Sequence, residues 1–187
     1  MTDSYSKIIE IASQLMSKNG YHATSLQMIA DKVEISKSTI FHYFMNKEAI
    51  LLALLKTTIP PAITVLSELA NNKDLSGHEK LKRFLQFHMR LLAKKGNILH
   101  IYLSESKHLE KRNKKKYMEI RREYTKLVKQ IIAQIQQENP NKFKGLNTTI
   151  ITNSILGMCN GAVEWYNKKG ELTIDEIADQ MYRIVYN

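Results

Sequence analysis

The sequence predicts an all-helical protein, with a short N-terminal unit of three helices and a longer helical C-terminal part. Three observations support this fold class. The 187 residues contain only 7 glycines and 3 prolines, so long stretches carry no helix breaker. Apolar residues recur every three or four positions along most of the chain. Capping sequences, such as Ser76 with Glu79 and Thr173 with Glu176, mark expected helix starts.

The first elements predict a helix-turn-helix. One helix is expected to end at 19–21, and a second is expected over 25–32. A turn over 33–35, which lacks glycine, precedes Ser36 as the cap of a third helix over 37–44. This order of short helices is typical of proteins that place the later helix in the major groove of DNA.

The helix expected over 37–44 has two different faces. Ile40 and Phe44 are four residues apart and would anchor it to a core. The opposite face carries hydrogen-bonding side chains, namely Lys37, Ser38, Thr39, His42 and Tyr43. Such side chains can donate to guanine, touch a thymine methyl group or bind phosphate oxygens. A short amphipathic helix with a solvated polar face is the alternative, but the exposed aromatic rings favour a contact surface.

Residues 5–52 closely resemble the TetR family of transcriptional repressors. The resemblance rests on Asn19-Gly20-Tyr21, on Ala23-Thr24-Ser25 before Ile29-Ala30, and on the run from Ser36 to Glu48. It implies a homeodomain-like helix-turn-helix that binds a double-stranded DNA operator. The DNA contacts that the resemblance implies are Thr24, Ser25, Gln27, Lys37, Ser38, Thr39, His42, Tyr43 and Lys47. Phe41 stands where the family usually has tyrosine, so a phenol contact to phosphate is not expected there.

The rest of the chain predicts further helices. The helix that follows Asn46 is expected to stop before Pro60-Pro61, because proline interrupts helices. The other expected helices lie at about 62–72, 76–96, 98–109, 114–138, 147–168 and 174–186. With the resemblance, this organisation predicts a DNA-binding domain over 1–47 and a ligand-binding and dimerisation domain over 48–187.

The last two expected helices are candidates for a homodimer interface. Their apolar residues occupy more than one face, which predicts a four-helix bundle between two copies, as the TetR resemblance also implies. The expected interface residues are Ile151, Ile155, Met158, Ala162, Ile177, Met181 and Ile184. Core packing within one chain is the alternative. A homodimer would read an inverted-repeat operator.

A small-molecule inducer is expected to bind in the C-terminal domain. Candidate pocket residues, which could equally be ordinary core, are Phe84, Phe87, His88, Tyr102, Tyr124, Met158 and Trp165. Residues 156–178 resemble the TetR-like regulators of fatty-acid or sterol breakdown, which respond to acyl-coenzyme A thioesters. This resemblance implies a long-chain acyl-coenzyme A whose phosphates meet Arg112, Lys115, Lys116, Arg121 and Arg122. The alternatives are that these cations form a solvated face, and that the protein is a drug-responsive repressor of an efflux pump.

The charge distribution limits the functional classes. The net charge of +10 suggests an anionic partner, yet residues 1–50 carry five basic and five acidic residues. The surplus lies in 51–187, and residues 107–129 hold ten basic and three acidic residues. A non-specific basic nucleic-acid-binding protein is therefore the alternative from another class, and the neutral N-terminal part speaks against it.

Other classes find little support. The single cysteine, Cys159, excludes an intramolecular disulfide and fits a cytoplasmic protein. Without a signal peptide or a long uncharged apolar run, we expect no membrane partner. Because we find no metal-ligand pattern, nucleotide loop or catalytic triad, we expect no cofactor, no metal and no enzyme. The operator, the regulated genes, the inducer and the sign of regulation stay open.

Overall fold

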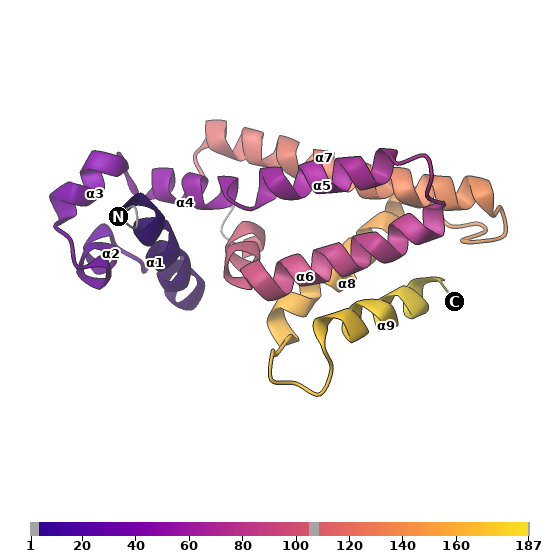
Figure 1. Cartoon of the computed structure of the whole chain (residues 1–187). Helices are drawn as coiled ribbons and strands as arrows, with labels where there is room; N and C mark the ends of the chain where they lie inside the picture. Colours follow the sequence, from indigo (N-terminus) through magenta and orange to yellow (C-terminus); the bar gives the residue numbers. More distant parts are fainter. Residues whose placement is uncertain (1–3, 105–108, 187) are drawn as a thin grey trace. The chain divides into compact units, whose positions relative to one another are not determined.

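The computed structural model describes residues 4–104 and 109–186, and every regular element in this part of the chain is an α-helix. The all-helical fold class is therefore confirmed. Figure 1 shows the helices coloured along the chain. In chain order they are α1 (Ser4–Asn19), α2 (Leu26–Val33), α3 (Lys37–Tyr43), α4 (Lys47–Lys56), α5 (Ile59–Asn71), α6 (Gly77–Ser104), α7 (Lys111–Glu138), α8 (Thr148–Trp165) and α9 (Ile174–Tyr186).

The chain divides into two compact units, which are described separately. Unit 1 comprises residues 1–60 and 97–118 and so contains α1 to α4, the end of α6 and the start of α7. Unit 2 comprises residues 61–96 and 119–187. Unit 1 is larger than the predicted DNA-binding segment 1–47, because two long helices of the C-terminal part contribute their ends to it.

One apolar core holds unit 1 together. It contains side chains from every helix of the unit, among them Ile8, Ala12, Met16, Ile29, Ile40, Ile50, Leu54, Ile101 and Tyr117. Burying one isoleucine or leucine side chain contributes roughly 1.5–3 kcal/mol. The position of the short helix α3 is therefore set by the surrounding core and not by its own helical propensity.

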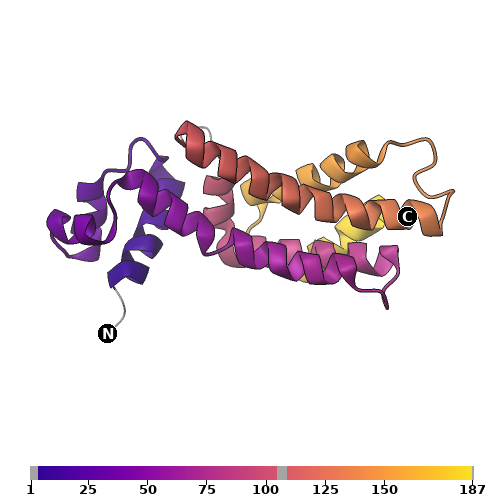
Figure 2. The same cartoon turned by 90° about the horizontal axis from the view of Figure 1, so that it is seen from above.

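Unit 2 is a bundle in which α5 and α7 run side by side, as Figure 2 shows. Lys80 of α6 is almost fully buried, and its ammonium group donates to the Ala70 carbonyl at 2.8 Å and to Gln134 Oε1 at 2.7 Å. Gly77 lies so close to α7 that an added Cβ would be 2.7 Å from Ile135 Cγ1. These contacts hold the end of α5 and the start of α6 firmly against α7.

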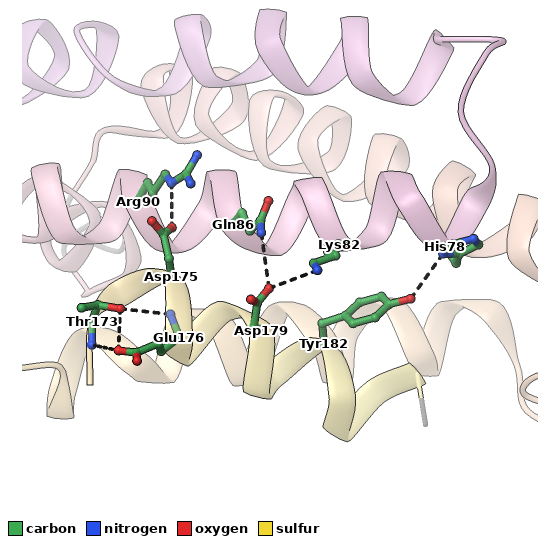
Figure 3. A network of polar contacts seen from close by, with 9 residues as sticks. All are labelled: His78, Lys82, Gln86, Arg90, Thr173, Asp175, Glu176, Asp179 and Tyr182. Atoms are coloured by element: carbon green, nitrogen blue, oxygen red, sulfur yellow. Dashed lines mark hydrogen bonds and ion pairs between the residues drawn. The ribbon is translucent and has the colours of Figure 1, made fainter. Parts of the chain in front are cut away.

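A ladder of polar contacts joins α9 to α6 within unit 2 (Figure 3). It consists of pairs at helical spacing on both helices, namely Arg90 with Asp175 at 2.7 Å, Gln86 and Lys82 with Asp179 at 3.3 and 3.6 Å, and His78 with Tyr182 at 3.4 Å. Most of these groups are exposed, so each pair contributes little energy. Burial of Ile177, Ala178 and Met181 provides the main attachment of α9.

The helix boundaries differ from the predicted ones at two points. Pro60 and Pro61 lie in the first turn of α5, where the missing N–H group has no helical partner to lose. The predicted stop at 94–96 is only a kink, since Lys95 has non-helical angles (φ −131°, ψ 25°) and α6 then continues. Burial of Ile98 and Ile101 in unit 1 explains why the helix resumes after this kink.

One segment departs from the expectation of no long apolar run. Lys47–Asn71 is long and apolar enough, by length and composition alone, to cross a membrane. In the structure this segment forms two helices, and 44% of its most apolar window is buried inside the protein. Leu51 and Leu54 belong to the core of unit 1, and Leu66 is fully buried in unit 2. Core packing therefore accounts for its apolar character.

Candidate functional site

The turn between α2 and α3 is set by its caps. Ser25 begins α2, and its hydroxyl accepts from the Met28 backbone N–H at 3.1 Å. Glu34 ends α2 in the left-handed conformation (φ 63°, ψ 45°), the position that glycine usually occupies. Ser36 then begins α3, and its hydroxyl accepts from the Thr39 N–H at 3.1 Å. The turn is thus complete without glycine, at the cost of a strained glutamate.

Helix α3 is anchored on one side and open on the other. Ile40 is fully buried and Phe44 nearly so, as their spacing predicts. Exposed side chains of the opposite side are Lys37, Ser38, Phe41, His42 and Tyr43, and Thr39 is half-buried. The structure therefore brings the five predicted contacts of α3 to one surface. Phe41 on that surface is 50% exposed, and Met45, which follows the end of α3, is 82% exposed.

Two residues that the sequence did not assign to the site help to hold this surface. The Ser36 hydroxyl lies 2.7 Å from the hydroxyls of both Ser38 and Thr39, so it orients two predicted contacts. Tyr5 of α1 meets Tyr43 edge-on at 6.4 Å between ring centroids and stacks on Phe44 at 5.0 Å. The sequence predicted Ser36 only as the cap at the start of α3. Nothing in the spacing of α1 pointed to Tyr5.

Lys47 has another role than the predicted phosphate contact. Its ammonium group donates to the carbonyls of Tyr21, His22 and Thr24 at 2.6, 3.2 and 2.8 Å. It also lies 4.3 Å from the centroid of the Tyr21 ring. A lysine has three N–H donors, and here all three are engaged within the protein. Lys47 therefore fastens α4 to the segment between α1 and α2.

The predicted DNA contacts just before and within the start of α2 include both buried and exposed side chains. Thr24 is completely buried, and its hydroxyl donates to the Gly20 carbonyl at 2.9 Å, so its side chain is not available to DNA. Ser25 and Gln27 are exposed. The Gln27 amide donates to Asp31 Oδ1 at 2.7 Å, one turn further along α2. The structure thus leaves Ser25 and Gln27, but not Thr24, on the open surface.

Glu48 connects α4 to the start of α7 inside unit 1. Its carboxylate is buried and accepts from the Glu110 backbone N–H at 2.8 Å and from the Asn113 amide at 3.0 Å. Glu48 lies in the first turn of α4, where a carboxylate is favourably placed relative to the positive end of the helix dipole. Because Glu48 follows Lys47 directly, adjacent residues of α4 hold α7 and the helix-turn-helix.

The predicted ligand residues are divided between the two units. Phe84 and His88 of α6 pack with Tyr124 of α7 in unit 2, and His88 Nδ1 lies 2.9 Å from the Tyr124 hydroxyl. Tyr102 belongs to unit 1 instead, where its ring packs on Tyr117 at 4.6 Å. Phe87 lies on α6 in unit 2 and is half-buried.

His88 is the most unusual group of this cluster. It is fully enclosed, and burial lowers its pKa to about 4, with the nearby Asn160 side chain acting in the opposite direction. The histidine is therefore neutral near pH 7. Its Nε2 atom is buried and has no partner at good hydrogen-bond geometry among the described residues, although the Asn160 side chain lies nearby. A buried polar atom without a partner costs free energy, so its presence in an apolar core is consistent with a binding function.

Met158 and Trp165 line a different hollow, on the outer side of α8 and α9. This hollow has a volume of about 460 Å³ and is also lined by Tyr166, Leu172 and Ile184. Trp165 and Ile184 are 57% and 76% exposed. An open apolar hollow of this kind is more typical of a protein interface than of an enclosed ligand site.

The predicted interface residues lie mostly inside unit 2. Five of them are buried by the chain itself, namely Ile151, Ile155, Ala162, Ile177 and Met181. They therefore form core between α8, α9 and the rest of the unit. Met158 and Ile184 line the outer hollow, and the buried Ile177 and Met181 also contribute to its lining. The open face of α8 is shifted around the helix and carries Ile150, Gly157, Gly161 and Trp165.

The predicted anionic-ligand cations are all exposed but lie in different units. Arg112, Lys115 and Lys116 belong to unit 1, whereas Arg121 and Arg122 belong to unit 2. None of the five side chains has a hydrogen bond or ion pair with another residue in the described ranges. Each unit therefore carries part of the predicted set.

Comparisons with known proteins agree with this architecture. Residues 8–54 match the family described as "Bacterial regulatory proteins, tetR family", and residues 74–187 match "Tetracyclin repressor-like, C-terminal domain". The chain is 28% identical over 159 residues to the fatty acid metabolism regulator protein of Bacillus subtilis (strain 168), and the match covers 85% of this chain and 81% of that protein.

Solved structures share the fold. A TetR/AcrR-family regulator from Thermobifida fusca is 26% identical, with a TM-score of 0.72, and the match covers 100% of this chain and 98% of the other. AibR, solved with isovaleryl coenzyme A and operator DNA, is 24% identical with a TM-score of 0.87 and 98% coverage of both chains. The two family matches, one of which covers more than half of the chain, show that the chain belongs to the TetR family of DNA-binding transcriptional regulators, a non-enzymatic family.

Proposed function

We propose that the protein is a repressor that binds a palindromic operator as a homodimer and leaves it when a small-molecule inducer binds. The observation that carries this proposal is the open face of α3. Lys37, Ser38 and His42 are exposed there, while Ile40 on the opposite side is fully buried. A helix that is fixed by its core and polar outward is suited to the major groove.

The side chains of this face suit the separate tasks of DNA recognition. Lys37 has no intramolecular partner in the described part of the chain, and it can donate to guanine O6 and N7. The Ser38 and Thr39 hydroxyls can bind phosphate oxygens and set the register. Phe41 is exposed and can contact a thymine methyl group. This combination of base and backbone contacts favours sequence-specific binding over a general attraction to DNA.

A second copy is expected to bind the open face of α8 and the outer hollow. Ile150 is 64% exposed, and it lies on the same helix as the exposed Trp165. At Gly157 and Gly161 an added Cβ would meet nothing within 4 Å, so another helix can approach closely. Two copies related by a two-fold axis would present two α3 helices to half-sites roughly 34–36 Å apart.

Replacing Gly161 by leucine tests this interface. The substitution adds a large side chain where the monomer has open space, so the fold should persist while the dimer dissociates. Sedimentation would then show monomers, and operator binding would be abolished. Lys129→Leu, on an exposed position of α7, places a leucine elsewhere on the surface and serves as the control. A Gly161→Leu protein that stays dimeric would refute the proposed interface.

The inducer is expected to be a long-chain acyl-coenzyme A. The name of the Bacillus subtilis relative refers to fatty acid metabolism, and AibR was solved with a coenzyme A thioester. In unit 2 the neutral His88 next to Tyr124 offers a hydrogen bond to a carbonyl oxygen, and Phe84 offers apolar contact. The exposed Arg121 and Arg122 of the same unit remain candidates for the phosphates. If the acyl-coenzyme A binds preferentially to the conformation that does not fit the operator, its binding would release the DNA.

A drug-responsive repressor of an efflux pump is the second candidate. A cationic drug would favour an acid in the binding region. Among the described residues of unit 2, the buried polar side chains are Lys80, His88 and Thr152, and none of them is acidic. This observation favours the thioester.

Thermal denaturation with matched ligands distinguishes the two inducers. Long-chain acyl-coenzyme A should raise the melting temperature and reduce operator binding, whereas coenzyme A alone and cationic dyes should do neither. Stabilisation by the dyes only would support the drug sensor. If no acyl-coenzyme A that is tested changes the affinity for the operator, the proposed inducer is wrong, while the proposed DNA-binding function is unaffected.

A further inference from the structure

The start of α7 carries a dense cluster of cations. Residues 111–116 contain five basic residues and one asparagine, and no acidic residue occurs between Glu110 and Glu119. The five basic side chains, Lys111, Arg112, Lys114, Lys115 and Lys116, are all exposed. In the ranges that the structure describes, none of them forms a hydrogen bond or an ion pair through its side chain. We call this group the α7 basic cluster.

This arrangement is unfavourable for the isolated helix. The N-terminus of a helix carries partial positive charge, so cations in its first turns are destabilising. Like charges three or four residues apart on one helix also repel one another. A cluster without acidic partners within the described chain therefore points to an anionic partner outside it.

The cluster is fixed to the DNA-binding unit. Glu48 in the first turn of α4 accepts from the Glu110 N–H and the Asn113 amide, which flank or lie within the cluster. Leu109 and Tyr117, one on each side, are buried in the same core as Ile40 of α3. The cluster and the recognition helix therefore belong to one compact body.

The helix-turn-helix itself carries no net positive charge. Residues 1–50 contain five basic and five acidic residues, and two of the basic side chains are engaged internally. Lys47 donates to three carbonyls, and Lys7 donates to the Val33 carbonyl at 3.2 Å. DNA binding draws much of its free energy from cations that neutralise phosphates. The α7 basic cluster supplies the charge that this unit otherwise lacks.

We propose that the α7 basic cluster binds backbone phosphates of the DNA that flanks the bases read by α3. The contact is independent of sequence, and it raises affinity and association rate without changing which bases are preferred. It rests on the proposed operator binding. It assigns Arg112, Lys115 and Lys116 to DNA in place of the predicted phosphates of a small ligand.

The salt dependence of operator binding tests the proposal. The test protein carries Lys114→Gln, Lys115→Gln and Lys116→Gln. The control carries Lys73→Gln, Lys126→Gln and Lys129→Gln, which remove the same charge at exposed positions of unit 2, two of them on the same helix. Affinity for a selected operator is measured between about 50 and 200 mM salt. Circular dichroism checks that both variants keep the helical content of the unmodified protein.

The proposal predicts a different result for each variant. The slope of log affinity against log salt should become shallower by roughly 0.9 for each phosphate that the test variant no longer neutralises. The control should keep the original slope. Shortening the duplex flanks should weaken the unmodified protein more than the test variant. The preference for operator over random DNA should persist in both variants, because the cluster reads no bases.

Two outcomes would overturn the proposal. Equal slopes for the test and control variants would show that the cluster does not touch phosphates. An unchanged slope, combined with an abolished response to acyl-coenzyme A, would assign the cluster to the ligand. Failure of the unmodified protein to prefer any sequence would instead refute the proposed operator binding, so the two failures are distinguishable.

Discussion

Single side chains decide which part of the helix-turn-helix is free to meet DNA. Lys47 and Thr24 direct their donors to backbone carbonyls of the same unit, whereas Lys37 is exposed on α3. Glu34 occupies the left-handed region that L-residues adopt only at a cost. These side chains therefore differ in whether they hold the fold together or are exposed for binding. Single substitutions can test such roles.

Glu34→Gly should stabilise the protein. Glycine removes the strain of the left-handed angle, although it adds freedom to the unfolded chain, so a net gain of up to about 1 kcal/mol is expected. Unfolding in urea measures the change. Glu10→Gly, at an exposed position inside α1, should instead destabilise by about 1 kcal/mol. Reduced stability of the Glu34→Gly protein would contradict the assigned conformation.

His88 should make stability depend on pH. Its pKa is about 4 in the folded chain and close to 6.5 when exposed, so the unfolded state binds more protons between these values. Stability should therefore fall on acidification, by about 1.5 kcal/mol between pH 6.5 and about pH 5. His88→Gln can keep a hydrogen bond to Tyr124 but cannot titrate, so its unfolding free energy should change less over this window. Equal pH dependence of the two proteins would show that His88 is not buried as described.

At the scale of the element, the apolar spacing predicted the helices and the buried face of α3. Ile40 and Phe44 are local in sequence, and their spacing alone defines one face. The role of Lys47 could not be predicted in this way, because its acceptors lie 23–26 residues earlier and approach only when α1, α2 and α4 pack. The open face of α8 was missed for a similar reason. The apolar spacing predicts two apolar faces on α8, but it does not indicate which face packs against the rest of the same chain.

Close packing between α6 and α7 gives a prediction at this scale. Gly77→Ala would place a Cβ 2.8 Å from the Ile135 backbone nitrogen, which cannot move aside easily. A decrease of roughly 1–3 kcal/mol in the free energy of unfolding is expected. Gly96→Ala, on the same helix, is the matched control, since its Cβ would meet nothing within 4 Å and the change should be neutral or stabilising. Similar stabilities for both variants would contradict the close approach at Gly77.

At the scale of the whole molecule, the distribution of charge is better described by the two compact units than by the order of the residues along the chain. The predicted boundary at residue 48 separated the helix-turn-helix from the cations of the later chain. Residues 97–118 nevertheless belong to unit 1, so a strongly basic segment is part of the body that carries α3. Long-range packing of this kind leaves no signal in local periodicity, and the charge of the DNA-binding unit was underestimated for that reason.

The proposed function depends above all on the outward face of α3, which we expect to read DNA sequence. Selection of bound duplexes from a random pool, followed by affinity measurements with the selected operator, tests this claim most directly. We expect the unmodified protein to enrich an inverted repeat. Lys37→Ala combined with His42→Ala should bring its affinity for that repeat close to its affinity for random DNA, whereas Lys73→Ala in unit 2 should leave the preference intact. No enrichment by the unmodified protein, or an unchanged preference in the Lys37→Ala and His42→Ala protein, would contradict the claim.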